Sequence, residues 1–168
     1  EAAAIYMKKD DKKSAAECFT NARMYPRAID IYEELGNHEV AGDLAQKIDQ
    51  QQRAAQLFAK AAEAHISQNN HIKASLIYRK KLDDAPTAQQ VLMDGWQANR
   101  DAINCLHLYF DYHGDQHSKV AEMKMFYDTM INSGTSESFL HVIKKSFSKG
   151  EAMPAAMRDI MFAIISGH

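Results

Sequence analysis

Small and apolar residues recur along the chain at a fixed spacing. An alanine is followed three and four positions later by apolar residues, the second often aromatic, so that all three lie on one face of an α-helix. The first five of these alanines are thirteen residues apart, the next step is twenty, and the last two are fourteen. This recurrence predicts a helical repeat, in which each helix buries its apolar face only against its neighbours. The eight units are Ala2-Ile5-Tyr6, Ala15-Cys18-Phe19, Ala28-Ile31-Tyr32, Ala41-Leu44-Ala45, Ala54-Leu57-Phe58, Ala74-Ile77-Tyr78, Ala88-Val91-Leu92 and Ala102-Cys105-Leu106.

The residues between these units predict where the helices end. Pro26 should end one helix, because its ring disfavours the helical conformation of the residue before it, and Gly36-Asn37 should end the next. Several of the predicted helices have only about two and a half turns, too few for stability in isolation. The predicted ranges are 1–8, 14–24, 27–35, 39–48, 51–68, 71–82, 87–95, 99–112, 118–131, 137–148 and 154–166.

The rhythm is lost after Ala102, where the predicted helices become longer. We therefore expect an all-α, right-handed solenoid of short antiparallel helix pairs over residues 1–112. Residues 113–168 should form a C-terminal helical cap region packed on its end, within one continuous domain. The chain starts at Glu1 without an initiator methionine, and its first repeat begins at Ala2 without a helix cap. We expect it to be part of a longer polypeptide.

Recurring alanines allow two helix backbones to approach closely at a crossing, while the residues three and four positions later interdigitate. The repeat is thus explained by packing alone. We accordingly interpret Phe19, Tyr32, Phe58 and Tyr78 as packing residues rather than as an aromatic cage for a ligand.

Composition places the chain among folded helical proteins. Of its 168 residues 46% are apolar and 25% charged, which disfavours disorder, and only three are prolines. A net charge of −2 provides no general attraction to nucleic acid, and no apolar run approaches the length of a membrane span. Cys18 and Cys105 occupy apolar positions of the repeat, where reduced, buried thiols are expected. We expect a cytoplasmic protein with no nucleic-acid binding and no membrane insertion.

The sequence offers one group of metal-ligand residue types, His113 and His117 flanked by Asp111 and Asp115. Gly114 interrupts the helix between the two histidines, so we interpret the segment as a solvated turn. The chain has no Gly-x-Ser-x-Gly motif and no glycine-rich phosphate loop. We expect no enzymatic activity, no catalytic residue, no metal and no cofactor.

Basic residues gather at three places, of which Arg79-Lys80-Lys81 is the most compact. It lies in the last turn of a predicted helix, where cations complement the helix dipole. The aromatic residues fall at packing positions rather than among the lysines, which argues against nucleic-acid binding.

Residues 58–86 resemble the tetratricopeptide repeat, which favours W-x2-L-G-x2-Y, then A-x3-F and a late proline. Lys81 stands where that family usually has a small residue, so the match is to a degenerate member. The segment 27–37 is also similar to helical repeats of vesicle-fusion attachment, coat and intraflagellar transport proteins and of large bacterial multidomain proteins. The resemblance covers residues 1–112 and implies a scaffold whose concave groove binds proteins or peptides. The matching residues are Phe58, Ala61, Ala62, His65, Ala74, Tyr78 and Pro86.

We therefore expect a protein-interaction scaffold with a protein or peptide partner, bound in the groove lined by the first helix of each pair. Polar residues not needed for packing are the candidates for this surface. They are Asn21, Gln46, Gln50, Asn69, Asn70, Lys73 and Arg79. The alternative is a structural spacer or self-association module flanking a catalytic domain outside this stretch.

Self-association would use the C-terminal helix. Met157, Ile160, Met161, Ile164 and Ile165 form an apolar stripe on it, in a region that holds six of the nine methionines. Two interpretations of this helix remain open. It is buried in a continuing solenoid, or it supplies an adaptable contact surface of the kind that methionine-rich patches offer.

Overall fold

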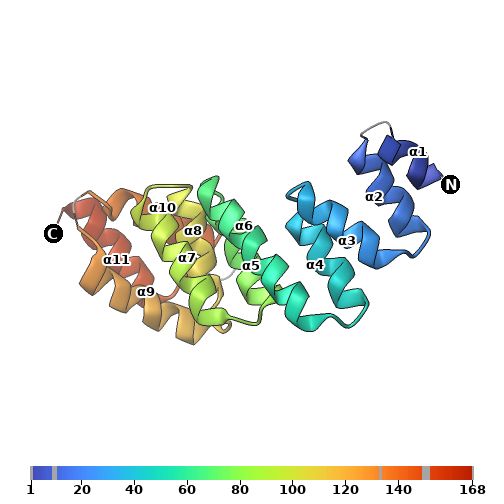
Figure 1. Ribbon diagram of the computed structural model, residues 1–168. Helices are drawn as coiled ribbons and strands as arrows, with labels where there is room; N and C mark the ends of the chain where they lie inside the picture. Colours follow the sequence, from blue (N-terminus) through green and yellow to red (C-terminus); the bar gives the residue numbers. More distant parts are fainter. Residues whose placement is uncertain (1, 9–10, 133, 149–151, 168) are drawn as a thin grey trace. The chain divides into compact units, whose positions relative to one another are not determined.

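The computed structural model describes residues 2–8, 11–132, 134–148 and 152–167. These residues form eleven α-helices and no β-strand, so the all-α prediction is confirmed (Figure 1). The helices are α1 (Ala2–Lys8), α2 (Lys12–Asn21), α3 (Tyr25–Glu34), α4 (His38–Lys47), α5 (Gln51–Ser67), α6 (His71–Lys81), α7 (Ala85–Gln97), α8 (Ala102–Asp111), α9 (Gln116–Met130), α10 (Ser136–Ser146) and α11 (Ala155–Ser166).

The chain divides into two compact units, Glu1–Ala88 and Gln89–His168. The division falls inside α7, fourteen residues before Ala102, where the sequence rhythm is lost. No helix in the described ranges is both long enough and apolar enough to cross a membrane.

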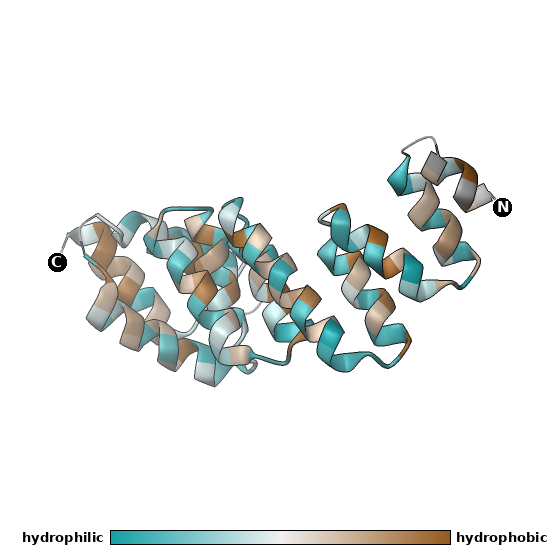
Figure 2. Ribbon diagram, in the orientation of Figure 1, coloured by the Kyte–Doolittle hydropathy of each residue, from teal (hydrophilic) through white to brown (hydrophobic). Residues whose placement is uncertain are grey.

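Helices of the first unit pack in the order of the sequence. Each of α1 to α5 packs against the helix that follows it, and α2 to α6 run in alternating directions (Figure 1). Apolar and hydrophilic residues alternate along these helices (Figure 2), and the buried ones are almost all apolar. Nearest-neighbour packing of this kind is typical of helical-repeat proteins.

The thirteen-residue spacing has a simple structural origin, a ten-residue helix followed by a three-residue turn. Helices α2, α3 and α4 each have 10 residues. The middle residue of each turn is left-handed, with φ of 58° at Arg23, 74° at Gly36 and 58° at Asp49. The next amide then donates back to a carbonyl five residues earlier, as in the 2.8 Å bond from Asn37 N to Tyr32 O. This is the Schellman arrangement, and it ends each helix at the same point.

The longer step between Ala54 and Ala74 comes from α5, which has 17 residues. Its seven additional residues correspond to about two helical turns. An insertion of whole turns returns the apolar face to the same side, so α5 packs against both α4 and α6.

Six of the recurring alanines are buried, as the packing interpretation requires, and Ala102 is half-buried. Tyr32 and Phe58 are also buried, while Phe19 and Tyr78 are half-buried. Helices α4 and α5 approach closely at Gly42, where a Cβ atom would lie 2.7 Å from Cε1 of Phe58. The alanines that are at most 2% exposed are Ala15, Ala28, Ala41, Ala54, Ala74 and Ala88.

The second unit is packed differently. Helix α8 packs on α9 and α10, and α11 also packs on α9 and α10, so the four helices close into a ring around a common core. Phe126 lies at its centre, with its ring centroid 5.5 Å from that of Phe110, 5.8 Å from Phe139 and 6.2 Å from Trp96. Loss of the thirteen-residue rhythm thus coincides with a change from sequential packing to a small aromatic-cored bundle.

Helix α11 is apolar along most of its length (Figure 2). Met157 and Ile160 are buried in the core of the second unit. Phe162 and Ile165 are 70% and 67% exposed. One face of α11 is thus buried within the second unit, and the other presents large apolar side chains.

Candidate functional site

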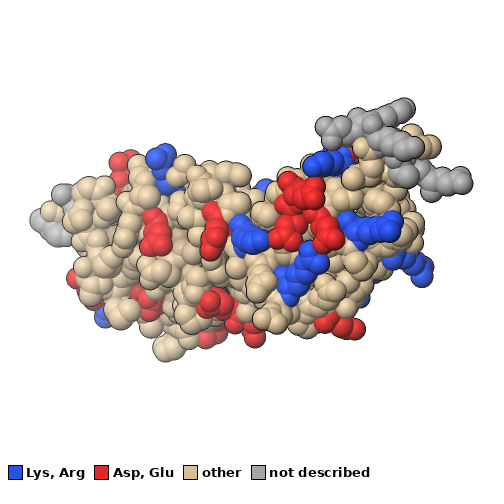
Figure 3. All heavy atoms as spheres, in the orientation of Figure 1, with Lys and Arg blue, Asp and Glu red and all other residues tan. Residues whose placement is uncertain are grey.

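A hollow of about 380 Å³ lies between α4 and α6 in the first unit. We call it the α4–α6 groove. Its lining residues are Glu39 from α4 and Lys73, Leu76, Ile77, Lys80 and Lys81 from α6. Figure 3 shows how charged side chains of both signs alternate over the visible face of the first unit.

The lining of the groove follows from the helical periodicity of α6. Lys73, Leu76, Ile77 and Lys80 are at positions i, i+3, i+4 and i+7, so they share one face of the helix. Ile77 is buried in the core, Leu76 is half-buried, and both lysines are exposed. The groove therefore has an apolar floor with a lysine at each end.

The α4 side of the groove is acidic. Lys81 Nζ donates to Asp43 Oδ1 at 2.6 Å and also lies 5.2 Å from the ring centroid of Phe58. Glu39 Oε2 lies 4.0 Å from His65 Nε2 on α5. These contacts tie α6 and α5 to α4 and hold the walls of the groove in place.

Lys73 and Lys80 differ from Lys81 in having no counter-charge. Neither has an ion-pair or hydrogen-bond partner within the part of the chain that the structure describes. Lys80 is in the last turn of α6, where the helix dipole favours a cation. Lys73 is the third residue of the helix, where the dipole favours an anion, and no acidic residue is present in that first turn. The position of Lys73 is therefore electrostatically unfavourable when no partner is bound.

Comparison of the repeats shows that this face of α6 is unusual. The residue two positions after the recurring alanine is Glu17 in α2 and Asp43 in α4, but Leu76 in α6. The position that carries a carboxylate in α2 and α4 is thus apolar in α6, between two unpaired lysines.

The corresponding surface between α3 and α5 is internally neutralised. Arg53 Nη2 lies 2.6 Å from Asp30 Oδ1 and 3.3 Å from Glu33 Oε2, and Lys60 Nζ lies 2.6 Å from Glu33 Oε1. The hydrogen bonds from Lys60 and Arg53 lower the pKa of Glu33, and the bond to Asp30 raises the pKa of Arg53. Each cation of this network already has its anion, so the surface offers less to a charged partner.

The second unit has a polar hollow of about 390 Å³ beside the ends of α8 and α10. Asp111 accepts a hydrogen bond from Lys119 and lies 3.2 Å from His107 Nδ1, and Lys145 donates to Asn104. Burial lowers the pKa of His107, an effect that Asp111 partly opposes. Most polar groups of this hollow are paired, but the Ser146 hydroxyl is buried without a hydrogen-bond partner among the described residues.

The four residues of the histidine-rich turn do not converge. His113 Nδ1 lies 3.2 Å from the Tyr109 carbonyl oxygen, and Asp115 caps α9 by accepting from Ser118 N at 2.9 Å. His117 is exposed, and Asp111 belongs to the polar hollow. Within the described ranges no group of three or more histidine, cysteine or acidic residues has the geometry of a metal site.

The residues selected from the sequence lie at several places in the first unit. Lys73 lines the α4–α6 groove, together with Lys80, which the sequence showed only as part of a basic cluster. Arg79 is half-buried on α6, and Gln46 is exposed on α4. The other four lie at helix ends or in turns: Asn21 ends α2, Gln50 and Asn70 precede α5 and α6, and Asn69 takes a left-handed conformation.

In the pairing that the resemblance to the tetratricopeptide repeat implies, α5 is a first helix and α6 is a second helix. The groove therefore lies on second helices, whereas the sequence analysis expected first helices. Its signal was present in the sequence as a lysine in the first turn of a helix and a leucine at a repeat position that is acidic in three earlier units, at Glu17, Asp30 and Asp43. Comparison of the chain with protein-family models, with curated proteins and with solved structures finds no match.

Proposed function

We propose that this chain is a protein-interaction scaffold, a right-handed tetratricopeptide-like solenoid in its N-terminal part, and that it binds a protein partner in the α4–α6 groove. The observation that carries the proposal is the pair of unpaired lysines, Lys73 and Lys80, at the ends of an apolar floor. Sequential packing of α1 to α6 supports the repeat architecture, because stacked helices present continuous surfaces between neighbours.

A protein partner suits this groove better than a small molecule. The groove is open to solvent, and its lining consists of three lysines, one glutamate and two aliphatic side chains. Small-molecule sites are usually enclosed and have precisely oriented polar groups. Partner surfaces, in contrast, combine an apolar centre with a charged rim.

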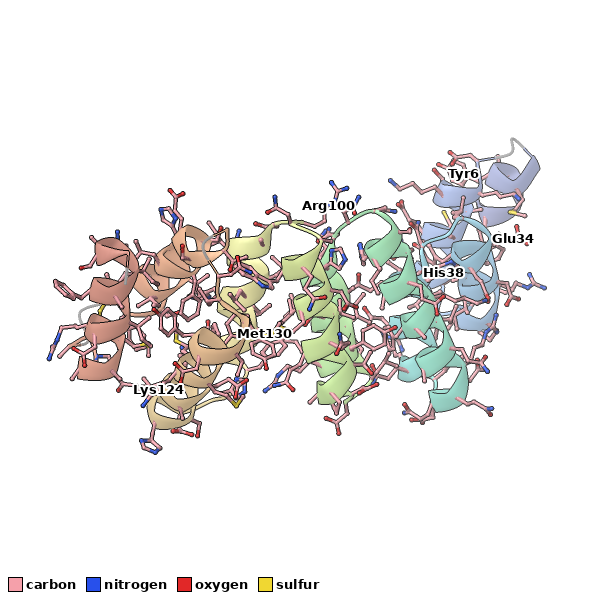
Figure 4. All side chains as sticks on the ribbon, turned by 90° about the vertical axis from the view of Figure 1, so that its left-hand side faces the viewer. Tyr6, Glu34, His38, Arg100, Lys124 and Met130 are labelled. Carbon is pink, nitrogen blue, oxygen red and sulfur yellow. The ribbon has the colours of Figure 1, made fainter. Side chains whose placement is uncertain are left out.

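Affinity capture with a groove variant and a matched control tests this function. The bait proteins are the wild-type chain, Lys73→Glu/Lys80→Glu and Lys124→Glu/Lys144→Glu, each incubated with lysate of the source organism. Lys124 lies on α9 in the second unit (Figure 4), and both control lysines are exposed. Each double variant changes the net charge by the same amount, from −2 to −6 (two Lys→Glu changes of −2 each).

The scaffold proposal requires a stoichiometric protein that the wild-type and control baits recover and the groove variant does not. A partner recovered equally by all three baits would bind elsewhere and would refute the assignment of the groove. Repeated recovery of nothing by any bait, under gentle conditions, would argue against the scaffold function itself.

Self-association is a second candidate, favoured by the exposure of Phe162 and Ile165 on α11. Single exposed apolar residues are common, but two large ones a helical turn apart form a patch. Light scattering over a range of chain concentrations should then show a dimer that Phe162→Ser/Ile165→Ser dissociates. A wild-type monomer at all concentrations would exclude this candidate.

A further inference from the structure

We infer that the occupant of the α4–α6 groove is an amphipathic α-helix with acidic residues seven positions apart and aliphatic residues between them. This inference rests on the proposed function and specifies the class of partner. It follows from three properties of α6: its spacing, its charge and its dipole.

The spacing of the recognition residues matches another helix. Lys73 and Lys80 are separated by seven residues, which is about 10.5 Å along the axis of α6. Leu76 and Ile77 lie between them on the same face. A partner helix with carboxylates at i and i+7 and leucines at i+3 and i+4 presents the same spacing, as in other helix-in-groove complexes.

An extended segment fits this spacing less well. Successive side chains of a strand point to opposite sides, so those on one face are about 6.8 Å or about 13.5 Å apart. Neither separation matches the two lysines. Only the helical repeat places two charges and two apolar residues on one face within that span.

Charge complementarity selects carboxylates over other groups. Both lysines lack a counter-ion within the described residues, whereas Lys81 is already paired with Asp43. A carboxylate beside Lys73 would also lie at the N-terminal end of α6, where backbone N–H groups and the helix dipole favour an anion. Lys73 and the N-terminal end of α6 would therefore both attract a carboxylate of the partner.

A designed peptide tests the inference without knowledge of the natural partner. The probe is a fluorescein-labelled, hydrocarbon-stapled helix of fifteen residues with Glu at i and i+7 and Leu at i+3 and i+4. A second probe has the same composition in a scrambled order that breaks this face, and a third has Lys in place of both Glu. Fluorescence anisotropy with the full chain measures the dissociation constant of each.

The acidic probe should bind the wild-type chain and the Lys124→Glu/Lys144→Glu control equally. Its dissociation constant should rise at least about tenfold with Lys73→Glu/Lys80→Glu, and also with Leu76→Asp, which introduces the acidic residue type that α2 and α4 have at this repeat position. The lysine probe should bind the charge-reversed variant more tightly than it binds the wild-type chain. All three substituted positions are at least partly exposed, and circular dichroism shows whether each variant remains folded.

Three results would overturn the inference. They are no binding of the acidic probe, equal binding of the scrambled probe, and binding that the groove substitutions do not weaken. Displacement of the acidic probe by a tenfold lower concentration of single-stranded DNA would instead assign the lysines to nucleic acid, and would also overturn it. If the probe fails while the groove substitutions still abolish affinity capture, the scaffold function stands and the partner is not such a helix.

Discussion

Lys73 is placed where an α-helix disfavours a cation. It lies in the first turn of α6, which contains no acidic residue, and it has no partner among the described residues. A residue that weakens the free protein and is not needed for packing is a good indicator of a binding role, because function is what compensates for such local costs.

Replacement of this lysine should therefore increase stability. Lys73→Glu places an anion at the N-terminal end of α6 and should raise the free energy of unfolding by about 0.3–1 kcal/mol. Lys124→Glu, in the middle of α9, is the control that shows whether any Lys→Glu change alters the free energy of unfolding. Urea unfolding followed by circular dichroism measures both. A destabilised Lys73→Glu variant would mean that Lys73 makes a stabilising contact in the free chain.

Gly42 shows how closely α4 and α5 approach. A Cβ atom at this position would lie 2.7 Å and 2.8 Å from two carbons of the Phe58 ring, which is itself 1% exposed and unable to move freely. Gly42→Ala should therefore destabilise the chain by about 1–3 kcal/mol, despite the higher helix propensity of alanine.

A double-mutant cycle isolates this contact. Phe58→Leu shortens the side chain facing Gly42, so Gly42→Ala should cost less in the Phe58→Leu background than in the wild-type chain. Urea unfolding of the four proteins gives the coupling energy. Equal costs in both backgrounds would show that the ring does not limit the approach of the two helices.

Cys105 is a structural thiol. It is fully buried, it donates to the Arg100 carbonyl oxygen at 3.4 Å, and burial raises its pKa to about 11. At pH 8 the thiol is therefore almost entirely protonated and shielded. In a Cys18→Ser chain, a thiol reagent at pH 8 should label Cys105 rapidly in denaturant and very slowly without it. Rapid labelling of the folded protein would show that α8 opens readily.

At the scale of elements, the turns between the helices repeat the same backbone conformation. The left-handed position is occupied by Arg23, Gly36, Asp49 and Asn69 in successive turns. Glycine accepts this conformation without strain and Asn or Asp tolerates it, whereas an arginine is strained there. Equivalent turns of one chain thus provide a matched comparison of residues at the same backbone geometry.

Substitutions in two of these turns should have opposite effects on the stability of the chain. Arg23→Gly should stabilise the chain by about 0.5 kcal/mol, because the relief of left-handed strain exceeds the entropy that glycine adds to the unfolded state. Gly36→Ala should destabilise it by about 1 kcal/mol, although no atom lies within 4 Å of the added Cβ. Thermal unfolding measures both. Shifts of the same sign would contradict this account of the turns.

Sequence reasoning located all eleven helices found among the described residues, because the apolar spacing and the turn residues agree with each other. Boundaries were less accurate. Helix α2 begins at Lys12 rather than at Ser14, because the Asp11 carboxylate accepts from Ser14 N and caps the helix earlier. Helix α8 begins at Ala102 rather than at Asn99, because Asn99 and Asp101 both take left-handed conformations.

The groove was harder to predict than the helices. Lys73 was selected for its polarity, but nothing in the sequence indicated that Lys81 and Asp43 would pair while Lys80 would not. The two residues of such an ion pair belong to helices that are separated by one other helix in the sequence. The distance between them depends on the angles at which these helices cross. Repeat periodicity determines which residues share a face, but not which faces lie opposite one another.

At the scale of the whole molecule, the two units differ in how their helices depend on one another. In the first unit each helix packs on its sequence neighbours, so the loss of one helix exposes only the next. In the second unit α8, α9, α10 and α11 close a ring around shared aromatic residues. Removal of any one of them opens the whole core.

Hydrogen exchange should reveal this difference. Phe139 is fully buried against Phe110, Phe126 and Tyr127, so Phe139→Ala should cost about 3–5 kcal/mol and accelerate exchange in all four ring helices together. Gly42→Ala should accelerate exchange most in α4 and α5 and progressively less toward α2. Mass spectrometry of the exchanged peptides measures both. Equal acceleration of hydrogen exchange in all helices from α2 to α6 would contradict this expectation. It would mean that the first unit unfolds as one cooperative block, despite its sequential packing.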